Sequence, residues 1–205
     1  MIYSNNLLNI LSDIDCEIIL SSDLLYEYIK SKYPNIKLVA SVIKSIYETT
    51  QNIDETEYIN SLLAKYDRVV IRSEYFLENK NKIKLLNNLN KIELLVNQNC
   101  AYNCLNSKAH YALFEKYNRG KLSYSDVIRF AQNICPRFDN PNVKLNTLGH
   151  SDVVEAINLG ITNLKLQGRM LPFDAMIKEL YQHFFNDKYD YEFFRSKIYE
   201  EYKLK

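Results

Sequence analysis

The sequence predicts an α/β fold built on a parallel sheet. Short β-branched runs alternate with longer amphipathic segments along most of the chain. Nearly continuous apolar strands separated by helices are typical of parallel sheets covered by helices. The spacing, about 25–30 residues per strand–helix unit, suits either a (β/α) barrel or a doubly wound sheet. No glycine-rich phosphate-binding loop follows any of the runs, which disfavours nucleotide-binding versions of the fold.

Five runs satisfy the strand pattern. They are residues 17–20, 36–40, 68–71, 92–96 and 161–166. A sixth strand is expected at the extreme N-terminus, ending near Tyr3. A complete eight-stranded barrel typically needs about 250 residues, so five or six strands indicate an incomplete barrel or an open sheet.

The segments between these runs have helical periodicity. Helices are expected over residues 24–29, 54–66, 80–89, 109–117, 124–133 and 152–158. Asp152 and Glu155 have capping-box spacing, and Gly160 stands where a helix C′ residue belongs. Pro172 is expected to open the C-terminal helical segment, at about 172–205.

We interpret residues 1–205 as a single domain. A long stretch without strands, at about 97–150, is expected to be a helical and loop insertion within it. Chains of this length usually fold as one domain or as one domain with a small appendage.

Composition excludes several classes of protein. Apolar residues make up 47% and charged residues 25% of the 205 residues, which is ordinary for a globular protein and excludes disorder. The 26 basic residues nearly balance the 25 acidic ones. The chain therefore lacks the general positive field that favours nucleic-acid binding, although a local patch stays open.

Hydropathy and cysteine usage indicate a compartment. No run of apolar residues is long enough to cross a membrane, and no signal peptide is visible, so no membrane partner is expected. The four cysteines are therefore expected in a reducing cytoplasm, where structural disulfides are rare.

Polar residues follow the predicted strands directly. Ser41, Arg72 and Asn97 stand at three such positions. Working residues of parallel α/β folds lie at the carboxyl ends of strands, so these three are candidate substrate-binding residues. The alternative is that they are ordinary polar loop residues.

The sharpest local motif is Cys100-Ala-Tyr-Asn-Cys104, with Cys135 some thirty residues later. If residues 100–104 begin a helical turn, both sulfurs lie on one side. Thiolates gathered in this way suit a soft metal or an Fe–S cluster. The alternative is that the cysteines are small buried hydrophobes. His110 is a candidate ligand or general base, and otherwise a helix residue hydrogen-bonded to a loop.

Three segments resemble the collagenase-like peptidases of unassigned catalytic type and their uncharacterised (β/α)-barrel relatives. The first keeps the family's late-strand motif at Lys165, Gly168, Arg169 and Met170, with Gln167 in place of a glutamate. The second matches at Asn97, Cys100, Cys104, His110 and Tyr111, with Leu105 and Ser107 departing from the pattern. The third runs from Ser22 to Ser41.

The resemblance implies a partial TIM-type (β/α) barrel that lacks the first strands. By carry-over it implies an Fe–S cluster or metal on Cys100, Cys104 and Cys135. It also implies that Lys165 and Arg169 bind an anionic substrate or stabilise the rim, and we take these two residues with His110 as candidate catalytic residues. The implied substrate is RNA or a small anionic molecule. Gln167 removes a motif carboxylate, and no nucleophile or zinc motif supports the peptidase activity itself.

Two functions therefore stay open. One is a metal- or cluster-dependent enzyme, with a peptidase as a further variant. The other is a non-catalytic barrel that serves as a binding or assembly module. An open barrel edge is a pairing hazard, so we expect a second copy of the chain or a different chain to cover it.

Overall fold

The computed structural model describes residues 2–48, 54–102, 104–140, 142–167, 172–185 and 190–202. The strands are β1 (Glu17–Leu20), β2 (Lys37–Ala40), β3 (Arg68–Ile71), β4 (Ile92–Leu95), β5 (Asn97–Ala101), β6 (Leu145–Thr147) and β7 (Asn163–Lys165). The helices before the insertion are α1 (Ile2–Ser12), α2 (Asp23–Lys32), α3 (Val42–Glu48), α4 (Glu55–Lys65), α5 (Ser73–Glu78) and α6 (Lys80–Ile83). Those that follow are α7 (Ser107–Asn118), α8 (Tyr124–Ile134), α9 (Pro136–Asp139), α10 (His150–Asn158), α11 (Phe173–Phe184) and α12 (Tyr191–Glu201).

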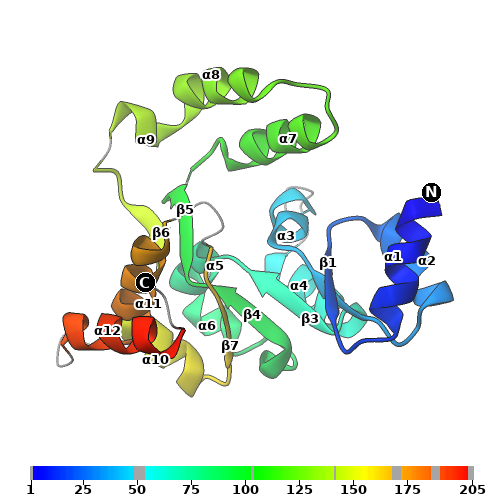
Figure 1. The fold of residues 1–205 in the computed structure, drawn as a ribbon, viewed down its shortest axis with the longest axis horizontal. Helices are drawn as coiled ribbons and strands as arrows, with labels where there is room; N and C mark the ends of the chain where they lie inside the picture. The colour runs from blue at the N-terminus through cyan, green and yellow to red at the C-terminus, as the bar shows by residue number, and fades with distance from the viewer. Residues whose placement is uncertain are drawn as a thin grey trace.

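A five-stranded parallel sheet organises the molecule (Figure 1). Its strands follow one another in the order β1-β2-β3-β4-β7, with every neighbouring pair parallel. The strand order of a doubly wound sheet reverses direction at a switch point, and this order does not. The α/β class and the parallel sheet are confirmed, and all five expected strands form within two residues of their predicted ends.

One face of the sheet carries the helices. Crossovers of one hand that advance in one direction must place their helices on the same face. The core between this helical face and the helices is made of aliphatic and aromatic side chains from both. Its largest fully buried members include Ile29, Leu38, Ile59, Leu63, Ile71, Phe76, Ile92 and Leu94. Figure 1 shows α4, α5 and α6 packed on this side.

The N-terminal helix α1 is the outermost helix of this layer. Tyr28 donates a hydrogen bond to Asn5 Oδ1 at 2.5 Å, and Tyr33 donates one to Asn9 Oδ1 at 2.8 Å. These bonds fasten α1 to the α2 region. The expectation of a strand ending near Tyr3 is wrong, because Leu7, Leu8 and Leu11 continue a helical rather than an alternating pattern.

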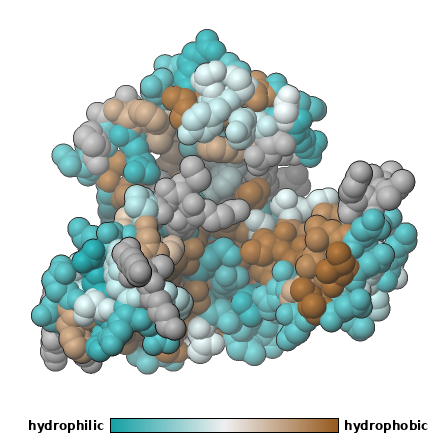
Figure 2. All heavy atoms as spheres, viewed as in Figure 1, coloured by the Kyte–Doolittle hydropathy of each residue, from teal (hydrophilic) through white to brown (hydrophobic). Residues whose placement is uncertain are grey.

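Large apolar side chains remain exposed at the β1 end of the sheet. Leu7, Ile10 and Ile14 of α1 and the following turn, and Ile19 of β1, are each at least 50% exposed. We call these four residues the edge patch. Figure 2 shows apolar side chains gathered on the surface over β1. Among the described residues β1 is an edge strand, so the patch borders a free sheet edge.

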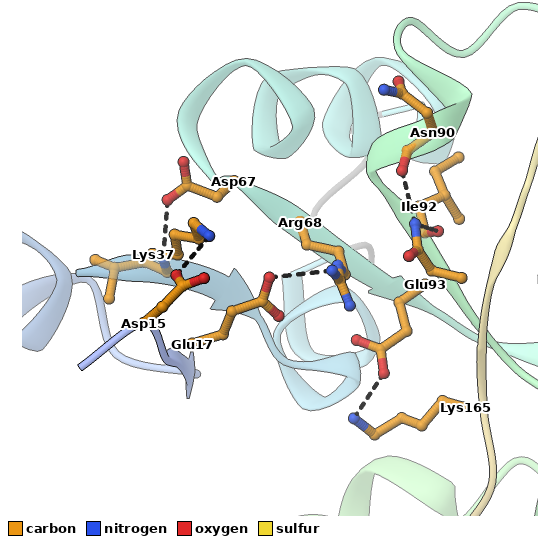
Figure 3. Close-up of polar contacts among 11 residues, drawn as sticks. Asp15, Glu17, Lys37, Asp67, Arg68, Asn90, Ile92, Glu93 and Lys165 are labelled. Atoms are coloured by element: carbon orange, nitrogen blue, oxygen red, sulfur yellow. Dashed lines mark hydrogen bonds and ion pairs between the residues drawn. The ribbon is translucent and has the colours of Figure 1, made fainter. Parts of the chain in front are cut away.

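The other face of the sheet, here the charged face, carries ion pairs (Figure 3). Arg68 Nη2 of β3 lies 3.0 Å from Glu17 Oε1 of β1, and so reaches across the whole of β2. Lys165 Nζ of β7 lies 3.1 Å from Glu93 Oε1 of β4. A small apolar group of Val39, Val70 and Leu95 lies nearer the carboxyl ends of the strands, packed against Val42 at the start of α3.

The insertion begins with β5 and ends with β6. These two strands pair as an antiparallel ribbon, which we call the β5–β6 hairpin although three helices lie between its strands. The helices α7, α8 and α9 lie beyond it (Figure 1). The expectation that the stretch at about 97–150 contains no strand is therefore wrong. Both strands are short and polar, and they pair over a long sequence separation, so no local sequence pattern predicts them.

The helix expected over residues 80–89 ends at Ile83 instead. Asn60 of α4 forms hydrogen bonds with two backbone groups that would otherwise continue this helix. Its Nδ2 donates to Leu85 O at 3.3 Å, and its Oδ1 accepts from Asn87 N at 2.8 Å. Asn88 then adopts a left-handed conformation with φ 54°. A side chain from another helix overrides the local periodicity here.

The remaining helix ends follow the expected signals closely. Gly160 has φ +103° just after α10, as a C′ glycine should. The Asp152 carboxylate accepts from Gly149 N at 3.1 Å, so the capping interaction starts one turn earlier than the Asp152–Glu155 spacing suggested. Pro172 is the N-cap of α11 rather than its first residue. No helix in the described ranges is long and apolar enough to cross a membrane.

Asp67 fastens the start of β2 to β3. Its carboxylate accepts from Leu38 N at 2.8 Å and from Lys30 Nζ at 3.2 Å, and its own N–H donates to Leu38 O at 3.0 Å. Burial acts to raise the pKa of Asp67, but the bonds from Leu38 and Lys30 outweigh it, and the net shift is downward. The stabilisation is therefore present above the ordinary carboxyl range and lost as the pH falls through the lowered pKa.

We predict that Asp67→Ala lowers the free energy of unfolding by about 1–2 kcal/mol at pH 7, because it leaves Leu38 N–H without its acceptor. Asp15→Ala is the matched control. It removes an exposed ion pair with Lys37, so we expect a much smaller loss than for Asp67→Ala. Urea unfolding of the three proteins measures both values. Equal losses in the two variants would contradict the role given to Asp67.

Candidate functional site: a polar cluster at the strand ends

Arg72 begins the site at the carboxyl end of β3. Its Nη2 lies 2.6 Å from Glu55 Oε1 of α4, and its Nη1 lies 3.2 Å from Glu74 Oε2 of α5. All three side chains are more than three-quarters buried. The guanidinium therefore joins the start of α4 to the start of α5, directly above the sheet, and leaves two carboxylates against one cation.

The β5–β6 hairpin adds a pair of buried amides. Gln98 and Asn146 are opposite partners in the ladder, so their side chains lie on the same face of the hairpin. Each residue is only 1% exposed. Asn146 Nδ2 donates to Glu74 Oε2 at 3.4 Å and to Ala101 O at 3.3 Å, which joins the hairpin to the Arg72 ion pairs.

Cys100 completes this group. Burial raises the pKa of its thiol, and the neighbouring charges of Cys104, Cys135 and Glu74 raise it further, against a hydrogen bond from Gln98 that lowers it. We call Arg72, Glu74, Gln98, Cys100 and Asn146 the strand-end cluster. Its thiol is protonated at neutral pH rather than activated as a nucleophile.

The three cysteines of the insertion share one neighbourhood but not one helix. Cys100 lies in β5 and Cys104 in the loop before α7, so the expected helical turn over 100–104 is wrong. Cys135 lies between α8 and α9. Asn106 Nδ2 donates to Ile134 O at 2.8 Å, which holds the Cys104 loop against the end of α8 beside Cys135.

A metal or cluster would need more than these thiols. Cys16 directly precedes β1, the edge strand of the parallel sheet, and its thiol donates to Leu11 O at 3.4 Å. Within the ranges that the structure describes, no three His, Cys, Asp or Glu side chains are arranged to hold a metal ion. As placed, the donor set does not fit a four-thiolate cluster, and we derive no chemical step through one.

Asn97, a predicted substrate-binding residue, is instead engaged in a structural network. Its Oδ1 accepts from Gln167 N at 2.6 Å, and its Nδ2 donates to Gln167 O at 2.9 Å and lies 3.2 Å from Glu179 Oε2. His183 bonds to the same Glu179 oxygen at 3.1 Å and to Leu148 O at 2.6 Å. This network holds α11 against the carboxyl ends of β4 and β7.

The other predicted residues are spread over the molecule. Lys165 is paired with Glu93 on the charged face. The Ser41 hydroxyl accepts from Ile43 N at 3.3 Å and caps α3. His110 lies on α7, where its ring packs 5.0 Å from that of Phe114 and burial lowers its pKa. Arg169 lies outside the described residues.

Of the predicted site residues, the structure thus brings Arg72 and Cys100 together, with Cys104 and Cys135 nearby. Sequence reasoning missed Gln98, Asn146 and Glu55. Gln98 follows a predicted strand and could have been found by its position. Asn146 carries no local signal, because only the hairpin pairing brings it to the site.

A comparison of the chain with protein-family models, with curated proteins and with solved structures finds no match.

We predict that the alkylation of Cys100 by iodoacetamide has a rate–pH midpoint above that of an ordinary cysteine, because burial raises its thiol pKa. The measurement uses a variant in which Cys16, Cys104 and Cys135 are serine. The same variant in urea is the control and should return the midpoint to its ordinary value. A folded-state midpoint at or below that value would refute the assignment.

Proposed function

We propose that this chain is a binding and assembly module built on an open, barrel-type sheet. The consecutive strand order supports the proposal most directly, because a sheet wound in one direction carries its helices on one face and keeps two free edges unless it closes. A second copy of the chain covers the β1 edge. The partial barrel and the resemblance to collagenase-like peptidases stay predictions.

The edge patch favours this function. Leu7, Ile10 and Ile14 of α1 and the following turn, and Ile19 of the edge strand β1, are large exposed aliphatic side chains, and Figure 2 shows apolar surface over β1. Exposed apolar groups of this kind are typical of interaction surfaces. A free strand edge next to them offers backbone groups for pairing.

The net charge of the chain favours a second copy of the chain as the partner that covers the β1 edge. The chain carries a net charge of only +1, so two copies repel each other weakly. The rim of the patch carries both signs, since Asp15 and Lys37 form an exposed ion pair there. A two-fold interface sets the same surface against itself, and a rim of mixed sign can then pair across it.

The candidate catalytic groups also favour binding over catalysis. The Lys165 ammonium is paired with Glu93, and burial keeps the Cys100 thiol protonated. His110 lies on α7, whereas Lys165 lies on β7 in the sheet. A nucleophile needs a base within hydrogen-bonding distance, and these side chains come from different layers of the fold.

We predict that the wild-type protein is a dimer by light scattering and that Ile10→Lys/Ile14→Lys is a monomer. Both side chains are more than half exposed, so the variant should fold with an unchanged circular dichroism spectrum. The control is Leu85→Lys, which changes a similarly exposed leucine outside the patch and should remain a dimer. A monomeric wild type, or a dimer that survives the double substitution, would rule out this interface.

A metal-dependent activity stays the second candidate function because Cys100, Cys104 and Cys135 share one neighbourhood, although among the described residues no three such side chains are arranged to hold a metal ion. We predict that iron or zinc that copurifies anaerobically is lost from Cys100→Ser and retained by Cys16→Ser, since Cys16 lies next to α1, far along the sheet. Elemental and sulfide analysis of the two variants measures this. Equal retention in both would exclude Cys100 as a ligand.

A further inference from the structure

Charge is distributed unevenly along the chain. Residues 107–139, which form α7 to α9, include six basic and three acidic residues, whereas the rest of the chain has 20 basic and 22 acidic residues. The basic residues concentrate at the turn between α7 and α8. Three of the six residues at 116–121 are basic, and no residue at 116–125 is acidic. The insertion is thus the positively charged part of a nearly neutral chain.

The turn between α7 and α8 has a fixed backbone. Lys121 N donates to Lys116 O at 2.9 Å and Gly120 N donates to Tyr117 O at 2.8 Å, which together form a Schellman motif. Gly120 has φ +67°, as the motif requires. The next helix begins almost at once with a capping box at Ser123. The side chains of this turn are therefore held on a preformed support.

The positive charge of the turn is available to an external anion. Lys116 and Lys121 are exposed, and neither forms an ion pair with another described residue. Arg119 is exposed on the same turn. The next acidic residue along the chain, Asp126, is already paired with Arg129 at 2.7 Å.

Two tyrosines flank these cations. Tyr117 is 36% exposed and Tyr124 is 57% exposed, and their ring centroids lie 5.9 Å apart with the planes tilted by 57°. We call Lys116, Tyr117, Arg119, Lys121 and Tyr124 the basic tip. Figure 1 shows the turn between α7 and α8 at the end of the insertion away from β5 and β6. The basic tip therefore combines cations with exposed aromatic rings.

We propose that the basic tip binds a single strand of nucleic acid. Lysine ammonium groups neutralise phosphates and release their counterions, and aromatic rings stack on unpaired bases. An acidic peptide or an anionic membrane would use the charges but offers no bases for the rings, so a single strand uses more of this surface. The basic tip shares no residue with the edge patch, and the proposal does not depend on dimer formation.

The test is fluorescence anisotropy with a labelled oligothymidylate of about 12 nucleotides in about 50 mM potassium chloride. We expect saturable binding with a Kd of about 1–100 μM, which is typical of binding that rests on phosphate contacts. The logarithm of the association constant should fall with the logarithm of the salt concentration with a slope of about −1.4, as expected for two phosphate contacts. No saturable binding by the wild type would overturn the proposal.

A pair of double variants locates the binding surface. Lys116→Ala/Lys121→Ala should weaken binding at least about tenfold, because it removes both phosphate contacts. Lys84→Ala/Lys178→Ala removes the same charge from two exposed lysines outside the insertion and should bind like the wild type. All four positions are exposed, so both variants should keep the circular dichroism spectrum of the wild type. Equal losses in the two variants would show that net charge alone governs binding and would refute the site.

Stacking is tested separately from charge. Tyr124→Leu keeps an apolar side chain but removes the ring, so binding should weaken about fivefold or more. An abasic strand of the same length should bind the wild type and Tyr124→Leu equally. Full affinity of Tyr124→Leu for oligothymidylate would contradict the stacking role. Binding to phosphatidylserine vesicles without binding to oligothymidylate would make the basic tip a membrane surface and overturn the proposal.

Discussion

The direction in which the sheet is wound constrains everything else in the molecule. Because β1, β2, β3, β4 and β7 advance without reversal, each crossover returns on the same side, and one face takes most of the helix packing, with Val42 at the start of α3 on the other face. The aliphatic core is therefore one-sided. The other face must satisfy its residues with each other, and it does so with ion pairs between strands rather than with a second helical layer.

The carboxyl ends of the strands hold the polar groups that this winding brings together. Arg72 directly follows β3, and β5 begins two residues after β4 ends, so their side chains lie at the same edge of the sheet. Glu74 connects the two parts of the cluster, since the same carboxylate oxygen is bonded to Arg72 and to Asn146. A protonated thiol and one guanidinium paired with two carboxylates define a site with preformed polarity rather than one with an activated nucleophile.

The sequence anticipates the parts of the structure whose signals are local. The strand Arg68–Ile71 was predicted to the residue, because a β-branched run between polar neighbours has few alternatives. The helix after Lys80 was overestimated because Asn60, twenty residues earlier, competes for its backbone. Arg72 and Cys100 were found from their positions after strands. Asn146 could not be, because its partner Gln98 lies 48 residues away along the chain, and only the fold establishes the pairing.

The β5–β6 hairpin also sets how the insertion is attached. Tyr102 N donates to Lys144 O at 2.8 Å, so the chain leaves the sheet and returns to it through two adjacent strands. A segment whose two ends meet can change in length without moving the sheet, since a tight turn could close the same gap. A change in the length of α7 to α9 would therefore leave the strand ends beneath them in place.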